Sequence, residues 1–181
     1  MSDPGHPVPP ALPFGPRRGP ARWLARAGAV AALYVGLTWA TSAGPLRALH
    51  FGWPVGPVLV EFRVAESLAV LPILFPEAVP GLFVGVMLAN LLGGLGPWDV
   101  FGGSLVTLVA AYFTWRWRRS WLAYASPVVL NGLLISIYLS ALFGLPYWTT
   151  ALGITLSEAL VVLGLGVPLV RALRRRMEEP R

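Results

Sequence analysis

Long apolar stretches, almost free of charge, constrain the fold of this sequence more than any other feature. Only 12% of its 181 residues are charged and its mean hydropathy is +0.67, whereas soluble domains carry roughly 25% charged residues. A helix of about 20 apolar residues crosses a bilayer. The sequence therefore predicts an all-α integral membrane protein, a bundle of six transmembrane helices. The expected helices cover residues 22–42, 58–76, 78–94, 97–116, 121–143 and 147–170.

The two ends of the chain differ from this apolar body. Residues 1–20 contain seven prolines and no periodic apolar pattern, so we expect a disordered tail there. This segment also lacks the apolar centre of a signal peptide. We expect residues 21–173 to form the transmembrane domain, and residues 174–181 to form a basic C-terminal tail.

Arginine is distributed asymmetrically around the expected helices. Twelve of the fourteen arginines lie in the N-terminal flank and first turns of the first helix, around the break between the fourth and fifth helices, or after the sixth. The breaks on the opposite side hold only Arg47. Basic loops remain in the cytoplasm, so both termini are predicted to be cytoplasmic in a plasma membrane. The net charge of +6 is therefore better explained by an anionic lipid surface than by nucleic acid.

The absence of certain residue types excludes several functions. The chain has no cysteine, only two histidines and no lysine. A Walker A motif needs a lysine for the phosphates, so any ATP must be hydrolysed by another subunit. Thiolate and histidine metal centres are not expected, and no cofactor is predicted. Without a nucleophile–base pair, an intramembrane enzyme is a poor interpretation.

Polar residues are predicted mainly in the outer half of the membrane. From a rise of 1.5 Å per residue, Glu66, Glu158 and Asn131 lie about 12, 16 and 18 Å from the outer surface, and Asn90 about 6 Å. This distribution favours a pocket loaded from outside over a pore. The two asparagines could equally join helices by hydrogen bonds. Glu158 has no basic residue within two turns along its helix, which makes it a ligand candidate.

The charges at the start of the second helix have structural alternatives. Arg63 and Glu66 are three residues apart on one face and could neutralise each other. Glu61 is either a helix cap, favoured by the helix dipole, or a ligand contact. Glu77, in the "FPE" turn at the far end of this helix, is set apart from them.

The first helix contains small residues at four-residue spacing, in the run "ARAGAVAALYVG". Such faces let helices approach closely. The pairs are Ala25/Ala29, Ala27/Ala31 and Gly28/Ala32.

Three stretches together resemble the QueT family. They are "EFRVAESLAVLPILFPEAVPGLFVGVMLANLLGGLGPWDVFGGSLVTLVAAY" (61–112), "PVVLNGLLI" (127–135) and "PYWTTALGITLSEALVVLGLGVPLVRAL" (146–173). The resemblance implies a substrate-binding membrane subunit (S component) of an energy-coupling-factor transporter, which takes up queuosine precursors. It also implies capture of a 7-deazaguanine outside the cell and docking onto a transmembrane coupling subunit with two ATPases.

The resemblance and the depth estimates together give a hypothesis for the residues. S components commonly dock through small residues of the first helix, which implies Ala27 and Ala31, with Ala25 and Ala29 as the alternative register. Carboxylates can accept hydrogen bonds from a guanine-type edge and pair with an ammonium group. The hypothetical ligand contacts are Glu66, Glu158 and Asn131, completed by Arg63, Glu61 and Asn90.

Two rival functions remain open at this point. The chain could be an S component for another vitamin or nucleobase, because pocket chemistry alone does not select queuosine precursors. It could also be a stand-alone secondary transporter, although we see neither inverted repeats nor a polar path to the inner side.

Overall fold

The computed structural model describes residues 19–42, 53–55, 58–60 and 62–179. The expected tail falls largely on residues 1–18, outside the described residues. Apart from one short hairpin, the described chain is helical, as predicted. Its elements are α1 (Pro20–Ser42), β1 (Trp53–Val55), β2 (Val58–Val60), η2 (Val64–Ile73), α3 (Ala78–Leu92), η3 (Trp98–Gly103), α4 (Ser104–Arg116), α5 (Leu122–Phe143), α6 (Tyr147–Val161), η4 (Val162–Gly166) and α7 (Val167–Glu178).

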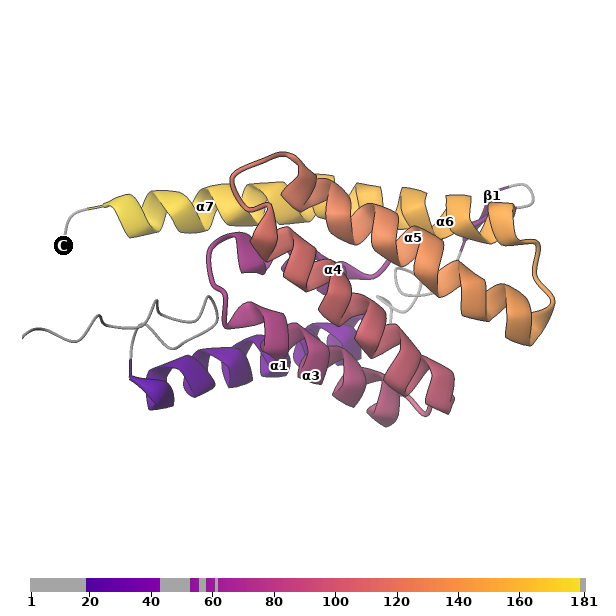
Figure 1. Ribbon diagram of the computed structural model, residues 1–181, viewed down its shortest axis with the longest axis horizontal. Coiled ribbons are helices and arrows are strands. Elements are labelled where there is room, and N and C mark those ends of the chain that lie inside the picture. The colour runs from indigo at the N-terminus through magenta and orange to yellow at the C-terminus, as the bar shows by residue number, and fades with distance from the viewer. Residues whose placement is uncertain (1–18, 43–52, 56–57, 61, 180–181) are drawn as a thin grey trace, which may run out of the picture.

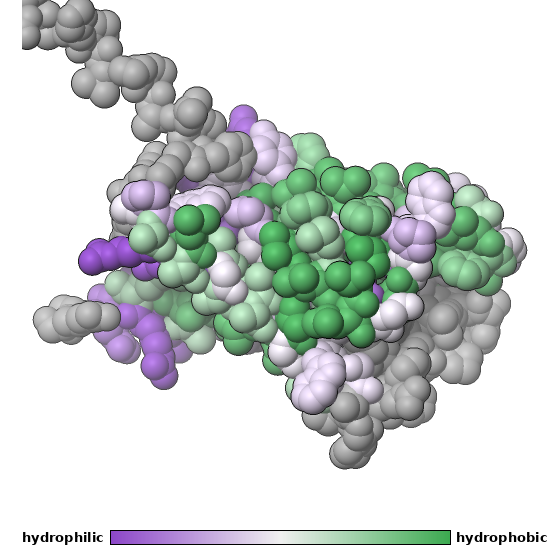
Figure 2. Space-filling model, turned by 90° about the horizontal axis from the view of Figure 1, so that it is seen from below, coloured by the Kyte–Doolittle hydropathy of each residue, from purple (hydrophilic) through white to green (hydrophobic). Residues whose placement is uncertain are grey.

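The long helices form a bundle whose arginine-rich ends gather together. Helices α6 and α7, joined through η4, form one long rod (Figure 1). The start of α1, the connection between α4 and α5 and the end of α7 lie at the same end of the molecule (Figure 1). Figure 2 shows hydrophilic residues gathered at this end and hydrophobic residues over much of the remaining visible face. This arrangement matches the arginine distribution along the sequence.

Among the residues that the structure describes, length and composition identify three helical segments able to cross a membrane: Pro20–Ser42, Leu122–Phe143 and Tyr147–Glu178. Val64–Ile73 and Ala78–Leu92 are apolar but shorter. Large apolar side chains such as Trp39 and Leu160 are more than half exposed, as side chains that contact lipid would be. The protein is therefore a membrane protein.

The prediction of a second helix over residues 58–76 is wrong in its first part. Val58–Val60 is a strand, paired antiparallel with Trp53–Val55. The helix begins only at Val64, after Arg63 in an extended conformation, and it is a 3₁₀ helix with Pro72 inside it. Valines favour a pleated strand, and this local preference outweighs the apolar pattern here.

The last helix is longer than expected, because it continues past residue 170 to Glu178. Pro168 does not end it. This proline lies in the first turn of α7, directly after the π-helical turn η4, where a missing backbone N–H is tolerated. By contrast, α5 ends where expected, at Gly144, which has a left-handed conformation with φ of 64°.

Two glycines of α3 allow α1 to pack closely against it. A Cβ added at Gly81 would lie 2.7 Å from the backbone oxygen of Ala27. One added at Gly85 would lie 3.0 Å from Tyr34 Cβ and 3.1 Å from Ala31 Cα. This contact directs Tyr34 into the interior, where it is 2% exposed.

Candidate functional site

A buried amide–carboxylate pair joins α5 to α6. Asn131 Nδ2 donates a 2.8 Å hydrogen bond to Glu158 Oε1. Asn131 is 2% exposed and Glu158 is 6% exposed. A carboxylate in an apolar interior is costly unless it is hydrogen-bonded, so this pairing explains how the helices tolerate Glu158. The two residues, which were predicted at similar depths, are therefore direct neighbours.

A second buried carboxylate is bound to the first helix. Tyr34 Oη donates a 2.5 Å hydrogen bond to Glu66 Oε1, linking α1 to η2. Glu66 is 6% exposed. Because η2 begins late, after the hairpin, Glu66 lies within its first turn and not two turns inside a regular helix. Hydrogen bonding to a tyrosine hydroxyl stabilises the carboxylate away from water.

The two pairs belong to one polar cluster. The segment that carries Arg63 and Glu66 connects them, because η2 packs against α1, which holds Tyr34, and against α6, which holds Glu158. We call Tyr34, Arg63, Glu66, Asn131 and Glu158 the interior polar cluster. Its members come from α1, the segment before η2, η2 itself, α5 and α6. Such a cluster presents carboxylate acceptors and an amide to a ligand, with one cation to limit the net negative charge.

One acceptor of this cluster is available for a donor. Asn131 Oδ1 is buried and has no hydrogen-bond partner within the part of the chain that the structure describes. Buried polar atoms normally have partners. Asn131 Oδ1 is therefore an additional hydrogen-bond acceptor beside Glu158. Among the described residues, no three histidine, aspartate or glutamate side chains gather as metal ligands would.

Asn90 makes a different kind of contact. Its Nδ2 donates a 2.7 Å hydrogen bond to the backbone oxygen of Asp99, and Tyr138 Oη donates to Asp99 Oδ1 at 3.0 Å. These bonds tie α3, η3 and α5 together, which is the helix-joining role considered for Asn90. A ligand role for Asn90 stays a prediction. Glu61 lies outside the described residues.

The structure places the two small-residue registers of α1 on different faces. Ala31 is buried, and both Ala27 and Ala31 lie against α3 at Gly81 and Gly85. Ala25 and Ala29 are exposed. A shallow apolar hollow of about 480 Å³ lies over this outer face, lined by Ala29, Ala32, Leu33, Gly36 and Leu37.

Tyr34 is the one member of the interior polar cluster that sequence reasoning missed. A tyrosine within an apolar span is easily attributed to packing or to the membrane interface. The available signal was its distance from both ends of α1, which puts a phenol where water is scarce and a partner is needed.

Comparison with known protein families gives a match over most of the chain. The family model of the QueT transporter matches residues 24–175, a range that contains every member of the interior polar cluster. No curated protein and no solved structure matches the chain.

Proposed function

The chain belongs to the QueT transporter family, and on this premise we propose that it is the substrate-binding membrane subunit of an energy-coupling-factor transporter. In this proposal it captures a 7-deazaguanine queuosine precursor on the outer side of the plasma membrane. Partner subunits, one transmembrane coupling protein and two ATPases, supply the energy for import. The chain has no lysine for a Walker A motif, which agrees with that division of work.

The observation that carries the proposal is the pair of buried carboxylates in the interior polar cluster. A guanine-type edge presents two neighbouring N–H donors, and one carboxylate accepts both. In the aminomethyl precursor, the second carboxylate would pair with the ammonium group. Asn131 Oδ1 offers a further acceptor beside Glu158. Because Glu66 and Glu158 are buried, ligand entry requires movement of the segments that cover them.

The proposed topology is multi-pass with both termini in the cytoplasm. It is supported by six arginines of α1, α4, the α4–α5 connection and α7 that surround one cavity at the same end of the bundle, which is then the cytoplasmic end. For docking to the coupling subunit we propose Ala25 and Ala29, because they are exposed whereas Ala27 and Ala31 pack on α3. Small residues there permit close approach of a partner helix.

Ligand binding and partner docking can be tested separately on the purified chain. Titration calorimetry should show binding of 7-aminomethyl-7-deazaguanine, with adenine at least about a hundredfold weaker because its donor and acceptor edge does not match. Ala29→Trp should keep this binding yet lose most co-purification with co-expressed coupling subunit and ATPases. Ala141→Trp, at an exposed alanine of α5, is the matched control and should keep both. Equal binding of adenine would contradict the proposed substrate. Full co-purification of Ala29→Trp with the partner subunits would contradict the proposed docking face.

Tyr34→Phe tests whether the hydrogen bond to Glu66 positions a ligand contact. The change removes one donor from a buried carboxylate, which costs about 1–3 kcal/mol. We expect about tenfold weaker ligand binding together with a lower melting temperature of the purified protein. Tyr124→Phe is the control, because this half-buried tyrosine of α5 packs against the apolar cluster around Val70 and Val162 and lies outside the interior polar cluster. Unchanged ligand affinity of Tyr34→Phe would mean that the hydrogen bond from Tyr34 to Glu66 does not contribute to ligand binding.

A further inference from the structure

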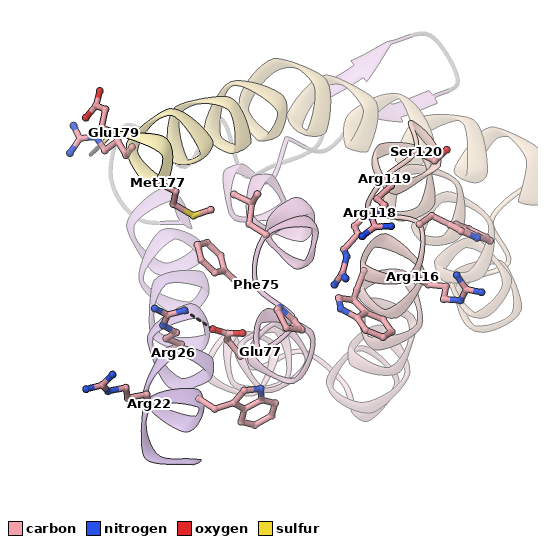
Figure 3. Close-up of a pocket in the computed structure, with 16 residues that line it drawn as sticks. Arg22, Arg26, Phe75, Glu77, Arg116, Arg118, Arg119, Ser120, Met177 and Glu179 are labelled. Atoms are coloured by element: carbon pink, nitrogen blue, oxygen red, sulfur yellow. Dashed lines mark hydrogen bonds and ion pairs between the residues drawn. The ribbon is translucent and has the colours of Figure 1, made fainter. Parts of the chain in front are cut away.

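A large open cavity lies at the arginine-rich end, apart from the interior polar cluster. It has a volume of about 1410 Å³ and is bordered by the start of α1, the turn between η2 and α3, the connection between α4 and α5, and the end of α7. Figure 3 shows Arg26 and Glu77 on one side of this space and Arg118 on the facing side. No member of the interior polar cluster lines it.

The rim of the cavity is strongly cationic. Among the described residues, two glutamates line it, Glu77 and Glu179, against six arginines. Glu77 is already engaged, because its Oε1 lies 3.0 Å from Arg26 Nη1 in an ion pair. An excess of guanidinium groups therefore faces the cavity, and it attracts anions. The arginines are Arg22, Arg26, Arg116, Arg118, Arg119 and Arg176.

Two of these guanidinium groups are held by aromatic rings. Arg118 Cζ lies 5.6 Å from the centre of the Trp115 ring, and Arg26 Cζ lies 5.8 Å from that of Phe75. Stacking of this kind restricts an arginine side chain and leaves its N–H groups directed outward. The cost of ordering Arg118 around an anion is thereby reduced.

Apart from Ser120, the other described residues of the lining are apolar or aromatic, which favours a lipid over a simple anion. The apolar residues of the lining include Trp23, Leu74, Phe75, Pro76 and Met177. A free phosphate ion would contact only the guanidinium groups. A phospholipid brings a phosphate for the arginines, and its glycerol and first methylene groups can cover the apolar surface. The volume is also much larger than one phosphate requires.

We propose that this cavity binds the phosphate of an anionic phospholipid from the leaflet at the arginine-rich end. Arginine forms two parallel hydrogen bonds with phosphate oxygens, and basic pockets between helices on the cytoplasmic side suit anionic headgroups. Arg118 is the central contact. A lipid held here joins α1, the η2–α3 turn and the α4–α5 connection, while the outer ligand site is left untouched.

The experiment compares lipids and anions on delipidated full-length chain in maltoside micelles. Native mass spectrometry should show phosphatidylglycerol bound at least about tenfold more tightly than phosphatidylcholine, whose headgroup carries no net charge. Arg118→Gln should weaken the phosphatidylglycerol complex about tenfold, and Arg118→Lys less, since it keeps the charge but loses the planar fork. Arg174→Gln removes the same charge from α7 outside the cavity, and should leave binding unchanged.

Three results would overturn the proposal. One is equal binding of the two lipids. Another is the same loss in Arg174→Gln as in Arg118→Gln, which would mean only general attraction to a basic surface. The third is complete displacement of phosphatidylglycerol by millimolar inorganic phosphate, which would identify a free anion as the occupant. Binding of the 7-deazaguanine in Arg118→Gln should equal that of the unmodified chain, so failure here leaves the proposed transport function intact.

Discussion

Glu158→Gln and Glu66→Gln are each expected to weaken binding of 7-aminomethyl-7-deazaguanine about a hundredfold. A hydrogen bond to a charged partner is worth about 1.5–3 kcal/mol, and each carboxylate is proposed to make two such contacts or one ion pair. Glutamine has nearly the same shape. Its side-chain oxygen can still accept from Asn131 in one variant or from Tyr34 in the other. The substitution therefore removes the charge and one acceptor while the surrounding packing is preserved.

Titration calorimetry on the purified variants measures this effect directly. Glu178→Gln is the matched control, because this carboxylate is exposed near the end of α7 and outside the interior polar cluster. It should bind like the unmodified chain. Each variant should still elute as a monodisperse peak in size-exclusion chromatography, which separates lost affinity from lost folding. Undiminished affinity in both glutamine variants would remove Glu66 and Glu158 from the ligand site.

The charged residues were easier to locate from the sequence than the elements that carry them. Charged and amide side chains are costly in an apolar span, so Glu66, Glu158 and Asn131 can be recognised from the sequence. The same cost predicts that they face the interior of the bundle and not the lipid. The structure places all three in one buried cluster. The depth estimates, by contrast, assumed the rise per residue of a regular α-helix. The 3₁₀ helix η2 and the preceding β1–β2 hairpin do not have this rise.

Helix pairing explains why the face of α1 could not be chosen from the sequence. Ala25/Ala29 and Ala27/Ala31 have the same spacing and the same composition. Only the close approach of α3, at Gly81 and Gly85, decides which pair is covered. That contact joins segments about fifty residues apart in the chain, and local periodicity carries no information about it. The partner of Tyr34 could not be named from the sequence for the same reason, since Glu66 lies on another element.

Gly85→Leu is expected to disrupt both folding and ligand binding through this contact. A side chain at Gly85 would meet Tyr34 Cβ at 3.0 Å and the backbone of Ala31 at 3.1–3.2 Å. Overpacking of this kind costs about 1–3 kcal/mol or more. In a membrane, where apolar side chains gain nothing by leaving lipid, close packing is itself the main attraction between helices. Separation of α1 from α3 would also withdraw the Tyr34 hydroxyl from Glu66.

The matched control is Gly28→Leu on α1, where an added Cβ meets nothing within 4 Å. Thermal unfolding in detergent should show a markedly lower melting temperature for Gly85→Leu. The melting temperature of Gly28→Leu should be close to that of the unmodified chain. Any Gly85→Leu protein that remains monodisperse should bind the 7-deazaguanine less tightly than Tyr34→Phe does, because it displaces the whole side chain and not one hydrogen bond. Normal stability and affinity in Gly85→Leu would mean that α1 does not depend on this contact, and that Tyr34 is positioned by other neighbours.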